Sequence, residues 1–500
     1  MRKLDRASAQ IAGRFLFLGV SVQILLGICW SGRSFGIFPE FGDSYTWLKA
    51  AETLVCDDYM GIGYPLFLML ARGIESISSI PYTFFVYTVQ LLAAFYAGIV
   101  FLRACGVTGK KRFLCWGSLG LLTFPCAMQS HLAVLPNSLG YSFLLLELSA
   151  LIRILRRDAV AEECATAAPV RPLHGLFEAG IWWALSTLFV VENLYLGLLP
   201  LIVLWLIHLW QLHSGKVEKK RVWQELVLLL AMAGILFTLV PLWQTPGSYG
   251  KAENTVSAAM MRRFSWSHMR SEDEYDEWPE ELRTWMTWKD TRTAGYYAGT
   301  MEVGIQKTLE DNYGKAQAQE IFRKYAMYHL KTYTSDNIHQ IVWDCLGYAM
   351  PTVLLQMLLS GRGYDSFSGR NVDIMMTGDP RLTEVLLKYS SWWFQSGIAI
   401  MVLAGIVCGA SVLLRRKKEK TAKTAQAGEP RKLEQKGLFW KILGVCGITA
   451  AGMILWYTMR DAGCLDYKNG LLPGSLWLVG MILWIDKTIS AGDTENNAEK

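Results

Sequence analysis

The residues with the clearest chemical potential lie in one stretch that follows the first apolar run of the chain. That stretch is Phe41-Gly-Asp-Ser-Tyr-Thr-Trp-Leu-Lys-Ala-Ala-Glu52, continued by Cys56-Asp-Asp-Tyr59 and Gly63-Tyr-Pro-Leu-Phe67. Asp43 stands directly before a predicted short helix, Ser44 to Leu54. A carboxylate there can act as the general base that removes a proton from an attacking hydroxyl group. It can also cap the helix, which is a common role for Asp before a helix.

Other acidic and basic residues could complete such a site. Asp57 and Asp58 fit a solvated turn, and the alternatives are a second acidic pair or a metal site. Binding of a divalent metal ion is therefore one alternative for these two residues, and no other cofactor is predicted. Arginine binds phosphate through two parallel hydrogen bonds, so an arginine cluster is a candidate phosphate clamp, the alternative being a basic turn or a bilayer anchor. The best cluster expected outside the membrane is Arg262, Arg263 and Arg270 with His268.

Two single residues near the ends of apolar runs add to the candidates. His131 could contact a donor molecule, although a lone histidine is more often a structural residue. Glu192 lies between two apolar runs, where it either marks the turn or faces a cavity. The second reading has a physical basis, because acids inside membrane proteins are costly and tend to be functional.

The composition indicates a membrane protein. Of the 500 residues, 52% are hydrophobic and 20 are Trp, which exceeds the usual apolar share of soluble domains. The formal net charge of +6 comes mostly from short loops between apolar runs, so it reports topology and gives no reason to expect a nucleic-acid partner. The 10 Cys are scattered, several of them inside apolar runs, and are interpreted as small core residues.

Ten apolar runs approach the length of about 20 residues that is needed to cross a bilayer. Lys and Arg gather in alternate loops between these runs. Under the positive-inside rule those loops are cytoplasmic, which places both termini inside and predicts a multi-pass protein of the cytoplasmic membrane. The predicted fold is therefore all-α, with ten transmembrane helices. The runs are 13–30, 81–103, 112–128, 137–155, 176–192, 194–211, 222–243, 390–414, 439–459 and 471–486.

Loops and composition divide the chain into parts. Residues 64–74 are apolar but too short to span, which predicts an interfacial or re-entrant helix. Gly304 to Tyr333 has helical spacing of apolar residues, so the long outer loop around it is expected to be a mostly helical domain. The parts are an N-terminal transmembrane module (1–243) with the acidic outer loop 31–80, the extracytoplasmic loop domain 244–389, C-terminal transmembrane helices (390–486) with a basic cytoplasmic linker at 415–438, and a cytoplasmic tail (487–500).

The layout of a first helix followed by Asp43-x-x-x-Trp-Leu-Lys-Ala-Ala-Glu-x-Leu and Gly63-Tyr-Pro-Leu-Phe67 resembles the GT-C superfamily. The resemblance is to polyprenyl-phosphate-sugar-dependent glycosyltransferases, especially bacterial relatives of protein O-mannosyltransferases and aminoarabinose transferases. It covers about residues 10–245, and Leu135-Pro-Asn-Ser-Leu-Gly and Val191-Glu-Asn-Leu-Tyr-Leu-Gly agree with it.

The chain also departs from these relatives. They often have Arg-Pro-Pro where Gly63-Tyr64-Pro65 stands here, a Glu in place of Asn137, and an Arg near Asn193. These differences concern the residues that would contact the donor phosphate and leave Asp43 unchanged.

The resemblance implies transfer of a sugar from a polyprenyl-phosphate donor to a hydroxyl acceptor at the outer face of the membrane. Such a sugar already carries an activated leaving group, so the enzyme needs a base, here Asp43, and cations that hold the phosphate. In-line attack would invert the anomeric centre, and the acceptor could be a glycan, a lipid or a protein. The implied cavity residues are His131, Asn137, Glu192 and His268.

Two other functions stay open. A polysaccharide polymerase or ligase would have its chemistry in the large outer loop. A non-enzymatic transporter or flippase of lipid-linked glycans would use Asp43 as a gate or surface residue. Against the transporter, the hydropathy pattern shows no matched repeats and no paired broken helices, which are the usual signs of a transport site at the membrane midplane.

Overall fold

The computed structural model describes the chain in separate ranges. Asp43, Asp57 and Asp58 lie outside them, as does the basic cluster of Arg262, Arg263, His268 and Arg270. The described residues are 44–56, 60–106, 130–131, 134–163, 172–215, 217–243, 276, 279–285, 311–332, 334–335, 338, 341–342, 345, 430–461 and 476.

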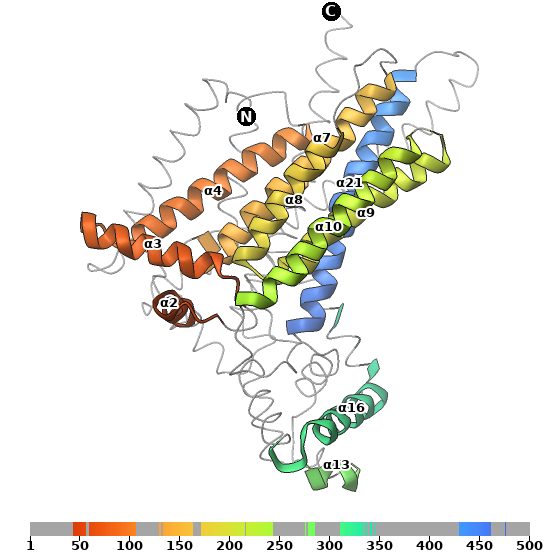
Figure 1. The fold of residues 1–500 in the computed structure, drawn as a ribbon. Coiled ribbons are helices and arrows are strands. Elements are labelled where there is room, and N and C mark those ends of the chain that lie inside the picture. Colours follow the sequence, from red (N-terminus) through yellow and green to blue (C-terminus); the bar gives the residue numbers. More distant parts are fainter. Residues whose placement is uncertain are drawn as a thin grey trace, which may run out of the picture.

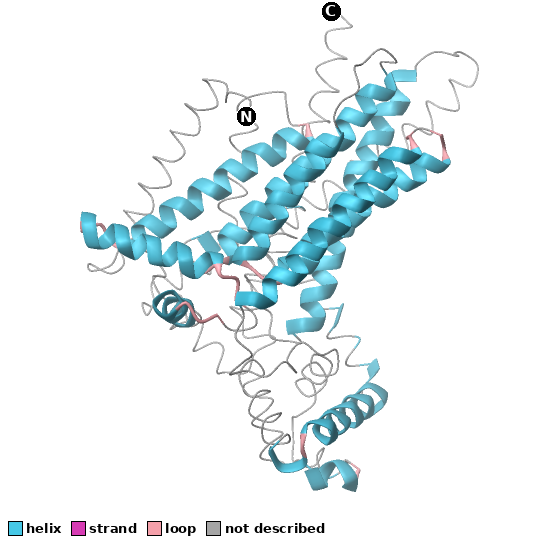
Figure 2. Ribbon diagram, viewed as in Figure 1, coloured by secondary structure: helices cyan, strands magenta, loops and turns pink. Residues whose placement is uncertain are grey.

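Every named element in these ranges is a helix (Figure 2). The one pairing of extended residues among them is an isolated antiparallel bridge between Met60 and Val190. The prediction of an all-α fold is thus confirmed for the described residues. In chain order (Figure 1) the helices are α2 Ser44–Thr53, α3 Gly63–Ser78, α4 Tyr82–Cys105, α7 Asn137–Glu163, α8 Pro172–Phe189, α9 Asn193–His213, α10 Lys219–Trp243, α13 Glu280–Trp285, α16 Lys315–Thr332 and α21 Pro430–Asp461.

Four of these helices are long and apolar enough to cross a membrane, namely α4, α7, α9 and α10. They coincide with the predicted runs 81–103, 137–155, 194–211 and 222–243, and a helix suits a bilayer because it satisfies its own backbone hydrogen bonds. The run at 176–192 is largely covered by α8, and the run at 439–459 lies inside α21. The runs 13–30, 112–128 and 390–414, and all of 471–486 except residue 476, lie outside the described residues, so the count of ten stays a prediction.

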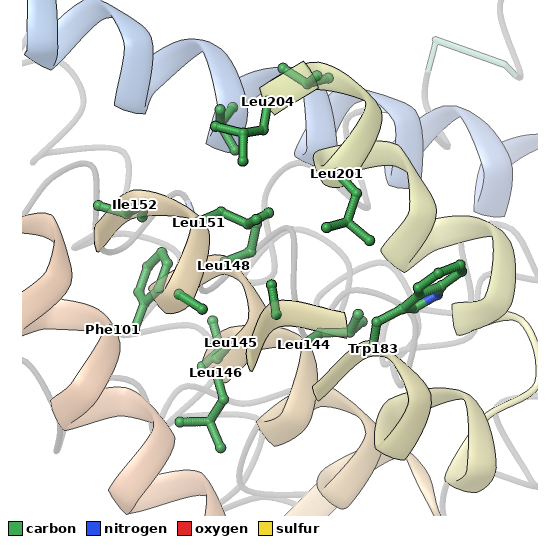
Figure 3. Packing of buried hydrophobic residues seen from close by; sticks show 14 of the residues in the cluster. Phe101, Leu144, Leu145, Leu146, Leu148, Leu151, Ile152, Trp183, Leu201 and Leu204 are labelled. Carbon is green, nitrogen blue, oxygen red and sulfur yellow. The ribbon is translucent and has the colours of Figure 1, made fainter. Parts of the chain in front are cut away.

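The helices form a bundle with α7 at its centre (Figure 1). In the 18-residue apolar stretch of α7 that is long enough to cross a membrane, 89% is buried inside the protein. The corresponding stretch of α10 is only 17% buried. The buried residues of α7 are mostly leucines, and they pack with residues of α4, α8 and α9 in one continuous core (Figure 3). Helix α10 instead exposes large apolar side chains such as Trp223, Leu230 and Ile235. That pattern fits a helix whose outer side contacts lipid.

A partly buried ionic cluster joins α7, α9 and α10 at the end of the bundle where α10 begins. Arg221 of α10 donates two hydrogen bonds to the Asp158 carboxylate of α7, at 2.9 and 2.8 Å, and a third to Glu225 at 2.9 Å. His208 of α9 lies between the two acids, with Nδ1 2.6 Å from Glu225 Oε2 and Nε2 3.1 Å from Asp158 Oδ2. Removing one partner of such a cluster typically costs about 3–5 kcal/mol, so the cluster fixes three helices to one another.

The shorter helices match their predictions in part. Helix α3 covers the predicted short apolar helix 64–74 and has only 16 residues. Within the predicted helix Gly304 to Tyr333, residues 304–310 and 333 lie outside the described residues, and α16 begins at Lys315. It is preceded by Gly314, whose φ of +78° breaks the helical path and is favoured by glycine. Lys324 of α16 lies over the ring of Trp285 of α13, 5.1 Å from its centre.

Candidate functional site

The helix that follows Asp43 is α2, and one of its faces is buried. Ser44, Trp47, Leu48 and Ala51 recur at helical spacing and are all buried, whereas Lys49 is exposed. The prediction of a short helix after Asp43 is therefore confirmed. Asp43 itself lies just outside the described residues, so both its proposed roles, base and cap, remain predictions.

Aromatic and ionic contacts attach α2 to α3. Trp47 meets the Tyr64 ring edge-to-face, with 5.6 Å between the ring centres. Arg72 of α3 donates a hydrogen bond to the Glu52 carboxylate of α2, and its guanidinium lies over the ring of Tyr82 at 5.6 Å. The Arg72 side chain therefore contacts both α2 and α4. The Lys49 side chain of α2 is exposed.

Two glycines bring the segment before α3 against the end of α8. A Cβ atom at Gly61 would overlap the backbone of Leu188, and one at Gly63 would lie 2.9 Å from the Leu188 carbonyl oxygen. The same approach produces the bridge between Met60 and Val190. Gly63 and Tyr64, which stand where relatives often have arginine and proline, therefore serve backbone contact and packing here.

A chain of hydrogen bonds runs inward from Tyr64. The Tyr64 hydroxyl donates to Gln90 Oε1 at 3.1 Å, and the Gln90 amide donates to the backbone oxygen of His131 at 2.9 Å. His131 Nδ1 lies 2.7 Å from Ser138 Oγ near the start of α7. Burial also raises the pKa of the Tyr64 phenol well above its ordinary value. The contacts connect α2 and α3 to the start of α7.

His131 is a fully buried, neutral imidazole. Burial lowers its pKa from 6.5 to about 3, because the charged form is poorly solvated inside the protein. Its Nε2 atom and the hydroxyl of Ser130 have no hydrogen-bond partner in the described part of the chain. His131 can therefore offer a neutral hydrogen bond, but it carries no positive charge for a phosphate at ordinary pH.

The other two described candidates sit at helix starts. Asn137 is half-buried as the first residue of α7. Glu192 is half-buried in the two-residue turn between α8 and α9, and its backbone oxygen accepts a hydrogen bond from Leu196. The prediction that Glu192 marks a turn is confirmed.

Sequence reasoning missed the polar residues that hold this end of the bundle together. Asn193 is buried and donates to Ser186 Oγ at 2.6 Å, and Ser186 donates to the backbone oxygen of Gly140 at 2.9 Å. Gln90 was missed too, although a lone amide in the apolar run 81–103 was a signal that it needs a buried partner. Glu147, the single acid within the run 137–155, was a comparable signal.

The described residues contain no group of His, Cys, Asp or Glu that could hold a metal ion. Asp57 and Asp58, for which a metal was left open, are outside those residues, and so are Arg262, Arg263, His268 and Arg270. His131, Asn137 and Glu192 are thus the candidates whose positions are known, and all three lie at the end of the bundle where α7 and α9 begin.

Two solved structures are similar to this chain. The matches are two crystal structures of ArnT from Cupriavidus metallidurans, one in the apo state and one bound to undecaprenyl phosphate. The apo structure is 10% identical, with 95% of this chain and 78% of that chain covered and a TM-score of 0.34. The second is 11% identical, with 96% and 79% covered and a TM-score of 0.33.

No protein-family model matches the chain. No curated protein matches it either.

Proposed function

We propose that this protein is a membrane glycosyltransferase that moves a sugar from a polyprenyl-phosphate donor to a hydroxyl acceptor, with Asp43 as the general base. The observation that supports this function is the anchoring of α2. The helix that begins one residue after Asp43 is too short to span, buries one face, and is tied to α3 and α4 through Trp47, Glu52 and Arg72. A base must be held in place to be effective, and a helix anchored by these contacts can do that.

The proposed reaction has a simple balance. Asp43 removes the proton from the acceptor hydroxyl, the oxygen attacks the anomeric carbon, and the bond from that carbon to the phosphate oxygen breaks. The polyprenyl phosphate leaves with the electron pair, and the anomeric centre is inverted. We place the reaction at the outer face of the cytoplasmic membrane, with both termini in the cytoplasm, because of the charge bias of the loops.

Cations are needed for the leaving phosphate. The candidates are Arg262, Arg263 and Arg270, because arginine binds phosphate with two parallel hydrogen bonds. Lys49 is a further candidate, because it is exposed on α2 close in sequence to Asp43. We assign His131 a different role from these cations. Burial keeps its imidazole uncharged, so it would act as a neutral hydrogen-bonding group near the start of α7.

The decisive experiment is Asp43→Asn in the purified full-length protein. Asn caps a helix about as well as Asp but cannot accept the proton, so the two roles separate. We expect normal yield and thermal stability, with transfer lowered by on the order of 10²–10⁴, the usual contribution of general-base catalysis. The assay follows loss of sugar from a panel of undecaprenyl-phosphate-linked sugars.

Asp57→Asn and Asp58→Asn are the matched controls, because they remove nearby acids from the same outer loop. They should transfer sugar at nearly the parental rate. An Asp43→Asn protein with near-normal transfer would refute the mechanism and move the role of base to Asp57 or Asp58.

A further inference from the structure

One acidic side chain lies inside the apolar core of the bundle. Glu147 is in the middle of α7, its side chain is fully buried, and the residues on both sides of it in sequence, Leu146 and Leu148, belong to the core (Figure 3). Neither of its carboxyl oxygens has a hydrogen-bond partner within the described ranges. An ionised carboxylate in such surroundings is far more costly than a neutral one.

Glu147 faces the junction of α7 with α8 and α9. A Cβ atom at Gly197 of α9 would lie 3.0 Å from Glu147 Oε2 and also 3.0 Å from the indole nitrogen of Trp183 in α8. That indole N–H already donates to the backbone oxygens of Asn193 and Leu194, at 2.9 and 3.2 Å. The close approach of α9 therefore depends on a residue without a side chain, and Trp183 does not neutralise the acid.

Three other acids of the bundle have cationic partners, in contrast to Glu147. Glu178 of α8 accepts a hydrogen bond from Arg153 at 2.6 Å, and Asp158 and Glu225 are compensated by Arg221 and His208. Glu147 forms no ion pair with any of the described residues. Other charged residues on the surrounding helices include Arg103 of α4, Glu178 of α8, His208 of α9, Glu225 of α10 and Lys441 of α21.

We propose that Glu147 is a proton-binding site: its carboxyl group carries a proton in the folded protein, and this neutral form allows α9 to pack against α7 beside Trp183. A proton neutralises the acid and needs no extra space, whereas a metal ion would need further ligands that the described residues do not offer. The site is separate from sugar transfer and stands whether or not Asp43 is the base.

Infrared spectroscopy of the purified full-length protein tests the protonation directly. At about pH 8 ordinary carboxyl groups are ionised, so a protonated carboxyl group gives its own C=O stretching band. We expect this band in the parent and its loss in Glu147→Gln, which keeps the size of the side chain. Glu178→Gln is the matched control, because it removes a carboxylate paired with Arg153, and it should keep the band.

A second measurement covers the case in which Glu147→Gln does not fold. Parent protein made with glutamate labelled with carbon-13 at the side-chain carboxyl should show the same band shifted to lower frequency. Absence of any acid band from the parent, or an identical band in a folded Glu147→Gln, would overturn the proposal.

The packing part of the proposal has its own test. The folded protein would keep this proton above about pH 4.3, where an unfolded glutamate loses it, so unfolding would release a proton. The thermal midpoint of the parent should therefore fall more steeply than that of Glu147→Gln as pH rises above this value. Glu178→Gln should fall as the parent does. Equal slopes for the parent and Glu147→Gln would show that the proton does not support the contact between α7 and α9.

Discussion

At the scale of single residues, His131 shows how burial sets chemical capability. The imidazole is enclosed, its Nδ1 is fixed by Ser138, and its pKa is about 3. It is therefore neutral at ordinary pH, so it can orient a polar group but cannot act as a cationic phosphate ligand. Cationic contacts must then come from lysine and arginine, whose side chains keep their charge.

The buried state of His131 predicts a specific acid sensitivity. In the unfolded chain its pKa returns to 6.5, so between pH 6.5 and about 3 the unfolded state binds a proton that the folded state does not. The free energy of unfolding therefore falls as pH falls through this window, by at most about 1.4 kcal/mol per pH unit from this residue. His131→Asn keeps a polar group near Ser138 but does not titrate, so its thermal midpoint should fall less between pH 7 and pH 4.

The control for this measurement is His174→Asn, because His174 is exposed at the start of α8. It should keep the parental pH dependence. If His131→Asn lost stability with acid as steeply as the parent and His174→Asn did, His131 would not be the group that stays unprotonated in the folded state.

At the scale of elements, the segment before α3 depends on a glycine that allows backbone contact. Gly61→Ala would place a methyl group on the backbone of Leu188, which cannot move aside without shifting α8. We expect a loss of about 1–3 kcal/mol, the usual cost of overpacking, seen as a lower thermal midpoint in detergent. Gly73→Ala is the matched control in α3, where nothing lies within 4 Å of the added atom.

That control should behave in the opposite way. Alanine is favoured over glycine inside a helix by roughly 0.5–1 kcal/mol, so Gly73→Ala should raise the midpoint slightly. Equal small effects of both substitutions would show that the segment 60–63 is not held against α8.

The sequence predicts a helix well where an apolar run of sufficient length defines it. The run 81–103 became α4 almost unchanged, but α10 begins at Lys219, before its apolar run, because charged residues also extend a helix. The candidate site was predictable only in part. The helix after Asp43 followed from local pattern, whereas the contacts of Gln90 with Tyr64 and His131 join residues far apart in sequence, and no local pattern encodes them.

At the scale of the whole molecule, the two ends of the bundle differ in character. One end has α2, α3 and the neutral polar chain from Tyr64 to Ser138, and the other has the compensated ionic cluster of Asp158, His208, Arg221 and Glu225. Basic residues gather at this end in α7 (Arg153, Arg156 and Arg157) and at the start of α10 (Lys219, Lys220 and Arg221). The positive-inside rule therefore predicts that this end is cytoplasmic and that the end with α2 is outside.

This orientation can be measured with thiols. It predicts that Cys345, which is partly exposed, faces outward and that Cys164 faces the cytoplasm. Two variants that each keep only one of these cysteines, with all others changed to serine, are treated with a membrane-impermeant maleimide on intact cells. Cys345 should react and Cys164 should not, while permeabilised cells should show reaction of both. Labelling of Cys164 in intact cells would reverse the topology, and the proposed base would then lie on the cytoplasmic side, away from an outward-facing acceptor.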